Sequence, residues 1–145
     1  MTVTENVEMI TEAFACGMTI REAINTYNID INCKDYMTND GVPTTILNKY
    51  CSYRDINLMN EAIENGADWN IRDDYGGVYD AVINGYSGYD NVDEPNNLEK
   101  LNKAILFLRE KKIPFVIEEM TYQKIIGDWK SLYEKSSIIQ EIILG

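Results

Sequence analysis

The chain of 145 residues carries 24 Asp and Glu against 13 Lys and Arg, which makes its formal net charge −11 at pH 7. Its 45% of hydrophobic and 26% of charged residues are typical of a single soluble globular domain, long enough to bury a core. Histidine is absent, which excludes Ser-His-Asp and Cys-His catalysis within the chain, and the sequence predicts no enzyme, no metal site and no cofactor.

The first unit, residues 1–35, is predicted to be an N-terminal repeat or cap made of two short helices. The S/T-x-x-E spacing of a capping box, which starts a helix, occurs at Thr2 and again at Thr19. The first helix is expected to end near Gly17. The second places apolar side chains on one side, at Ile20, Ala23, Ile24 and Tyr27. The stretch NIDINCKDYMTNDG that follows has the composition of turns.

The second unit, residues 36–73, repeats this pattern more clearly. A turn is predicted at Asp40-Gly41, and Pro43 suits the first turn of a helix over residues 44–50. A second helix is predicted over residues 56–64 from its apolar spacing, ended by Asn65-Gly66. The turn-rich stretch GADWNIRDDYGG, residues 66–77, comes next.

The third unit, residues 74–117, is predicted to hold a brief helix over 78–84 and a longer one over 98–111, separated by an inserted acidic loop, 85–97. Residues 118–145 carry apolar side chains at helical spacing, with a break near Ser136-Ser137. We interpret them as a helical cap over the apolar face that the end of a stack exposes. Dimerisation through SSIIQEIILG is the alternative.

This order of elements resembles ankyrin repeats, in which two antiparallel helices are followed by Gly-Ala-Asp-x-Asn and a turn that opens Asp-x-x-Gly. The best match, NGADWNIRDDYG, has the pattern residues Gly66, Ala67, Asp68, Asn70, Asp73 and Gly76. A fainter match, IDINCKD, lies 38 positions earlier and keeps Asp30, Asn32 and Asp35. The resemblance implies a single all-α domain, an ankyrin-like stack of about three degenerate helical-hairpin repeats.

The matching residues are interpreted as scaffold. Gly66 can supply a left-handed helix terminus, and Asp68 and Asn70 can bond to their own backbone in the turn. In proteins of this resemblance, ligands meet the hairpin tips and the inner helices, which directs attention to the side chains around the best tip. There, residues 61–96 hold nine acids against one base, a net charge of −8.

Aromatic side chains beside carboxylates are typical of an interface with a basic protein. The predicted partner-binding residues are Trp69, Asp73, Asp74, Tyr75, Tyr79, Asp80, Tyr86, Tyr89, Asp90, Asp93 and Glu94. Two alternatives stay open: Trp69 packs under the next repeat, or the acids form a solvated loop that serves solubility.

The sequence therefore predicts a non-catalytic, acidic inhibitor or immunity protein that neutralises a basic partner such as a toxin or nuclease, or a phage anti-defence protein of the same type. The alternative is an ankyrin-type adaptor that recruits a partner without inhibiting it. No direct nucleic-acid or membrane binding is expected, because the negative charge repels both surfaces. We expect a cytoplasmic monomer or weak dimer whose three cysteines, Cys16, Cys33 and Cys51, are reduced.

Overall fold

The computed structural model describes residues 16–28, 30–32, 36–37, 43–85, 95–127 and 136–144. Most of these residues are helical and very few are in strands, which confirms the all-α class. In chain order the elements are α2 (Ile20–Tyr27), β1 (Tyr36–Met37), β2 (Pro43–Thr44), α3 (Ile46–Tyr53), α4 (Ile56–Glu64), α5 (Val78–Asn84), α6 (Pro95–Glu110), α7 (Glu119–Ile126) and α9 (Ser137–Leu144). The helix predicted from Thr2, the turn at Asp40-Gly41 and the inserted loop between 86 and 94 lie outside the described residues.

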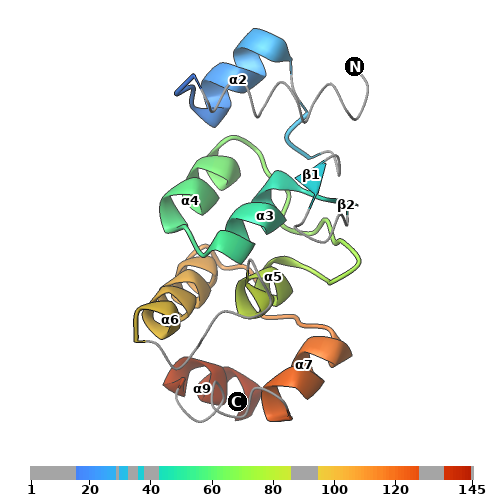
Figure 1. Ribbon diagram of the computed structural model, residues 1–145, viewed down its shortest axis with the longest axis vertical. Coiled ribbons are helices and arrows are strands. Elements are labelled where there is room, and N and C mark those ends of the chain that lie inside the picture. Colours follow the sequence, from blue (N-terminus) through green and yellow to red (C-terminus); the bar gives the residue numbers. More distant parts are fainter. Residues whose placement is uncertain are drawn as a thin grey trace.

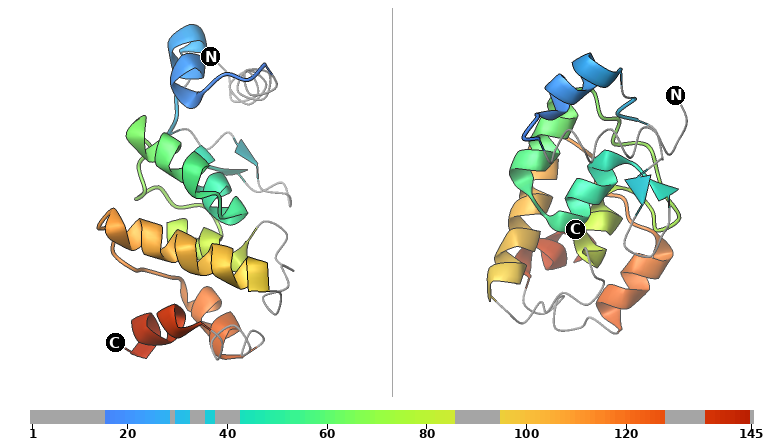
Figure 2. Two further views of the ribbon diagram at one scale, coloured as in Figure 1. Left: turned by 90° about the vertical axis from the view of Figure 1, so that its left-hand side faces the viewer. Right: turned by 45° about the horizontal axis from the view of Figure 1, so that its top comes forward.

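The helices lie in rows stacked along the long axis of the molecule (Figure 1). Within the stack, α3 packs against both α4 and α5, α5 packs against α6, and α4 contacts α6. Two columns result, one of α3, α5 and α7 and one of α4, α6 and α9, and the turned view in Figure 2 shows the second column descending through successive rows. Each row therefore covers one face of the next.

Local sequence signals explain where several helices begin. Thr19 forms the predicted capping box with Glu22 at the start of α2, and its hydroxyl accepts a hydrogen bond from the Glu22 amide (3.2 Å). Thr45 caps α3 in the same way through the Asn48 amide, and Asp55 caps α4 through the Leu58 amide.

Several predicted boundaries are wrong. Helix α3 ends at Tyr53 rather than at residue 50, and α6 ends at Glu110 rather than at residue 111. Helix α3 begins at Ile46 rather than at residue 44, because Pro43 and Thr44 pair with β1 in a two-stranded antiparallel ladder. Pro43 therefore lies in an extended segment and not in the first turn of the helix. Helix α6 begins at Pro95, three residues before the predicted start at Leu98, since proline is accommodated at the first position of a helix.

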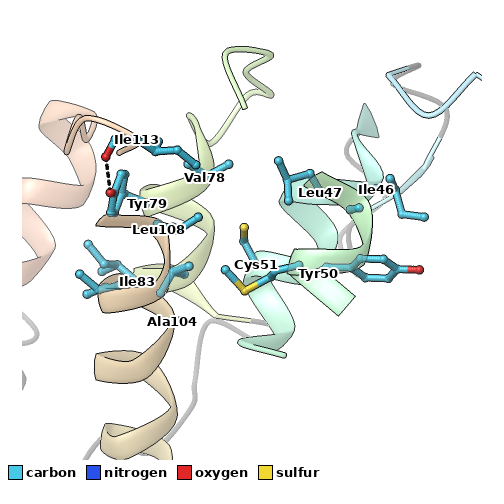
Figure 3. Packing of buried hydrophobic residues seen from close by; sticks show 14 of the residues in the cluster. Ile46, Leu47, Tyr50, Cys51, Val78, Tyr79, Ile83, Ala104, Leu108 and Ile113 are labelled. Atoms are coloured by element: carbon cyan, nitrogen blue, oxygen red, sulfur yellow. Dashed lines mark hydrogen bonds between the residues drawn. The ribbon is translucent and has the colours of Figure 1, made fainter. Parts of the chain in front are cut away.

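The core runs between the rows and is continuous along the described part of the stack. Figure 3 shows Leu47 and Cys51 of α3 on one side and, on the other, Val78 and Ile83 of α5 together with Ala104 and Leu108 of α6. All six are buried, and burial of this apolar surface is the main force that holds the rows together.

Helices α7 and α9 lie at the C-terminal end of the stack, where α7 contacts α5 and α9 contacts α6. Residue Ser136 is buried and α9 starts at Ser137, so the predicted break is found there. Among the described helices, none has both the length and the apolar character that crossing a bilayer requires.

Candidate functional site

The loop between α4 and α5, residues 65–77, is the candidate site, and its first turn is set by a glycine. Gly66 has a φ of +97°, as its predicted role as a left-handed terminus requires. The Ala67 amide donates back to the carbonyl of Ala62 (3.0 Å), which satisfies a carbonyl at the end of α4. A Cβ at Gly66 would meet no atom within 4 Å, so the glycine is needed for its backbone conformation and not for space.

The next turn is held by a bond that occurs twice in the chain. The carboxylate of Asp68 accepts the amide of Asn70 (2.8 Å), and the carboxylate of Asp30 accepts the amide of Asn32 (2.9 Å). The side chain of Asn32 then joins the two loops, accepting the Asp68 amide (2.7 Å) and donating to the Gly66 carbonyl (3.1 Å). Asp30 and Asp68, 38 positions apart, therefore stabilise equivalent turns, and Asn32 also connects successive rows.

The tip of the loop is a tight turn from Asp73 to Gly76, closed by two backbone hydrogen bonds between these residues (2.9 and 3.1 Å). The carboxylate of Asp73 accepts the Tyr75 amide (2.8 Å) and the Thr44 hydroxyl (2.5 Å). Asp73 was predicted to contact a partner, but its carboxylate is engaged within the protein and fastens the tip to β2.

Asp80 is not on the surface, which corrects its predicted role in binding. Its side chain is fully buried, and its carboxylate accepts hydrogen bonds from the Gly77 amide (2.9 Å), the Glu118 amide (2.8 Å) and the Thr121 hydroxyl (2.6 Å). The Arg72 guanidinium lies 3.8 Å from this carboxylate and also pairs with Glu118. Asp80 therefore ties the start of α5 to the start of α7.

Tyr79 is also misplaced by the sequence prediction, since only 1% of its surface is exposed. Its hydroxyl donates to the Ile113 carbonyl (2.5 Å), drawn as a dashed line in Figure 3. Its ring meets the edge of Phe115, with centroids 4.8 Å apart. Burial raises the pKa of the Tyr79 hydroxyl to about 12. The side chain is a core anchor and cannot contact a partner.

Three of the predicted residues remain at the surface of the described loop: Asp74 is exposed, and Trp69 and Tyr75 are half-buried. We call Trp69, Asp74 and Tyr75 the tip surface. Trp69 packs partly against the core, so the alternative in which it is a packing residue is realised in part. The other five predicted residues, Tyr86, Tyr89, Asp90, Asp93 and Glu94, lie outside the described residues.

The residues that hold the tip surface in place were not predicted. Thr44, Arg72 and Glu118 are far apart in sequence, and each acts through a contact with a distant segment. Asn32 alone carried a usable signal, because it repeats Asn70 at the 38-residue spacing. Partners that belong to another element cannot be inferred from a local pattern.

The chemical groups of the described residues can be stated directly. In the described ranges no three Asp, Glu or Cys side chains gather as metal ligands would. Burial raises the pKa of the Cys51 thiol far above its ordinary range, which keeps it protonated and unreactive. What the loop offers is a carboxylate and two aromatic side chains on a frame fixed by hydrogen bonds.

Comparison of the chain with protein-family models, with curated proteins and with solved structures gives no match.

Proposed function

We propose that the protein is a non-catalytic binding module, an acidic inhibitor that attaches to a basic partner protein through the tip surface. The observation that carries the proposal is the frame beneath Trp69, Asp74 and Tyr75. Asp73 is bonded to Thr44 and Asp68 is bonded to Asn32, so both flanks of the tip are tied to other parts of the chain. A preorganised loop loses little entropy on binding, which favours tight association.

Charge supports the choice of a basic partner. Residues 61–96 have a net charge of −8, and the whole chain has −11. A concentrated negative field steers positively charged proteins and accelerates their association. Nucleases and other toxins that act on nucleic acid need basic clefts, and an acidic inhibitor would occupy such a cleft. An immunity protein or an anti-defence protein is the biological form we propose.

At the level of the fold, we propose that the stack is ankyrin-like. The pairs α3–α4 and α5–α6 are neighbouring antiparallel hairpins in this reading, and α7 with α9 forms the cap. The recurrence of the same carboxylate-to-amide bond at Asp30 and Asp68 supports a repeat of 38 residues. The third unit departs from the pattern, because residues 85–94 separate its two helices in sequence.

The test begins with the partner. The tagged protein captures basic proteins from a lysate of its native source, and each captured protein is then purified and its binding measured by surface plasmon resonance. Asp74→Lys should slow association by about tenfold at low salt. Glu110→Lys, the same charge change at an exposed position of α6, should have a much smaller effect.

Tyr75→Ala should act differently, by raising the dissociation rate while leaving the salt dependence unchanged, as expected of an aromatic anchor. If Asp74→Lys and Glu110→Lys bind alike, the tip surface is not the binding site. The activity of the partner separates inhibition from recruitment: a saturated complex that keeps full activity would contradict inhibition and favour an adaptor.

A further inference from the structure

A second surface, of opposite charge, lies at the end of α3 away from the tip. A shallow groove of about 240 Å³ runs between the α3–α4 turn and α6, and it is lined by Tyr53, Arg54, Asp55, Ile56, Asn57, Lys100 and Lys103. Lys100 and Lys103 are the exposed cations of this lining, Arg54 is buried with its guanidinium bonded to α5, and Asp55 is the one acid, in a chain that has almost twice as many acids as bases. The groove is therefore a local exception to the charge of the protein.

The positive charge continues along α6 beyond the groove. Lys100, Lys103, Phe107 and Lys111 follow one another at helical spacing, so they form a stripe along one flank of the helix. The Lys111 ammonium lies 5.5 Å from the centre of the Phe107 ring, a cation–π distance. The stripe itself carries three bases, Lys100, Lys103 and Lys111, whereas residues 61–96 have a net charge of −8.

The groove and the tip surface lie at opposite ends of α3. Helix α3 begins beside β2, to which the tip is bonded, and ends at Tyr53, which lines the groove. Figure 1 shows β2 at the first end of α3 and the turn into α4 at the other. Eight helical residues span about 12 Å, which exceeds the screening length of about 8 Å at physiological ionic strength. A ligand at the groove is thus screened from the acids of the tip.

We infer that the groove and the stripe form a second interaction surface, which binds an acidic segment of a protein and receives one Glu or Asp side chain in the groove. The volume suits a single side chain and not a folded element. Lys103 is paired with Glu99 (2.7 Å), but both side chains are about 60% exposed, so the pair is exchangeable at small cost. A long polyanion such as nucleic acid is disfavoured, because it would extend beyond the stripe into the negative field.

This inference does not depend on the tip surface. If both hold, the protein carries two faces of opposite sign and can join a basic protein to an acidic one. That arrangement would give the adaptor alternative a physical basis, since the two contacts need not compete.

The test uses a fluorescently labelled hexaglutamate peptide and measures its polarisation at low ionic strength. The wild-type protein should bind it, and the double variant Lys100→Glu/Lys103→Glu should bind it about tenfold more weakly. The matched control is Arg109→Glu/Lys112→Glu, which makes the same charge change at exposed residues on the far side of α6 or beyond its end. It should lose less than about threefold.

Backbone amide shifts in the NMR spectrum locate the contact, and they should change first at Asn57, Lys100 and Lys103. Thermal melts confirm that both variants remain folded. Absence of binding to the wild type, or equal losses in both variants, would overturn the inference. Tighter binding of a single-stranded oligonucleotide than of the peptide would also overturn the inference, because the surface would then recognise phosphate groups rather than carboxylates.

Discussion

Asp80 is a charged side chain with no exposed surface, and its carboxylate accepts hydrogen bonds from the start of its own helix, at Gly77, and from the start of α7, at Glu118 and Thr121. A buried carboxylate stabilises a fold only while its hydrogen-bond donors are present. If either side of such a bond is removed, the polar group left buried without a partner costs more free energy than the bond contributed. Its neighbour Asp74 has the same chemistry and lies in water. The position of a carboxylate, and not its identity, decides what it does for stability.

Replacing Asp80 should be severe. Asp80→Ala leaves the Gly77 and Glu118 amides and the Thr121 hydroxyl without their acceptor, so we expect a loss of about 3 kcal/mol or more in the free energy of unfolding. Asp74→Ala is the control and should change it by less than about 0.5 kcal/mol. Urea titration followed by circular dichroism measures both, and equal midpoints would contradict the role assigned to Asp80.

Substitutions at two glycines distinguish the free-energy cost of backbone strain from that of steric overlap. Gly66→Ala should cost about 1 kcal/mol through its positive φ alone, because the new Cβ has open space. Gly76→Ala should cost more, since φ is +118° and the Cβ would also lie 2.5 Å from Cγ of Asp80. Gly66→Asn should recover part of the loss, as asparagine tolerates the left-handed region. Thermal melts rank the three variants, and a Gly76→Ala melt no lower than that of Gly66→Ala would refute the overlap.

Tyr79 makes stability depend on pH in the alkaline range. Its folded pKa of about 12 is above the ordinary value of about 10, so folding favours the protonated hydroxyl. The stabilisation is complete below pH 10 and is lost as pH rises from 10 towards 12. Tyr79→Phe should melt lower than the wild type at pH 9 and should lose less between pH 9 and 11. Parallel falls in the two melting temperatures would show that Tyr79 does not titrate as its burial implies.

At the scale of elements, α4 and α5 begin and end where the sequence predicts. The predicted stop of α4, Asn65-Gly66, directly follows its last residue, and α5 ends just before Gly85. The start of α3 was missed although Thr45 is a local N-cap signal, because Pro43 was assigned to the first turn of the helix, whereas it lies in the ladder between β1 and β2. Exposure was predicted least well. Tyr79 and Asp80 follow a surface turn in sequence, but α5 is covered by α3, α6 and α7.

Arg54 connects the end of α3 to the last turn of α5. It ends α3 with a φ of +56°, and its guanidinium donates to the carbonyls of Val82 (2.8 Å) and Ile83 (3.2 Å) in the last turn of α5. A cation there satisfies carbonyls that the helix leaves unpaired and complements its dipole.

Shortening this side chain should therefore weaken the contact between rows. Arg54→Lys keeps the charge but loses the planar pair of donors, and we expect a cost of about 2 kcal/mol. Arg21→Lys, at an exposed position with one side-chain bond to Asn65, should cost less than about 0.5 kcal/mol. Urea unfolding measures both, and equal costs would mean that the bonds to α5 contribute nothing.

On the scale of the whole molecule, charge is uneven along the sequence: residues 61–96 carry a net charge of −8, whereas Lys100, Lys103 and Lys111 follow one flank of α6. The two tests proposed above treat the surfaces separately, and each has its own matched control, Glu110→Lys for the tip surface and Arg109→Glu/Lys112→Glu for the groove. Ionic strength should weaken both contacts, but a variant of one surface should leave the second intact.

The bonds that cross between rows also bear on how such a stack could change in length. Asn32 serves the loop of the next row, Arg54 closes α5, and Asp80 holds the start of α7. In each of these three connections, one row supplies a hydrogen-bonding side chain to the backbone of another. The three connections use different residues and different geometry. Duplicating or deleting a row would therefore join surfaces whose donors and acceptors do not match. This chain is confined to its present number of rows, whereas arrays built of interchangeable units can grow and shrink by recombination.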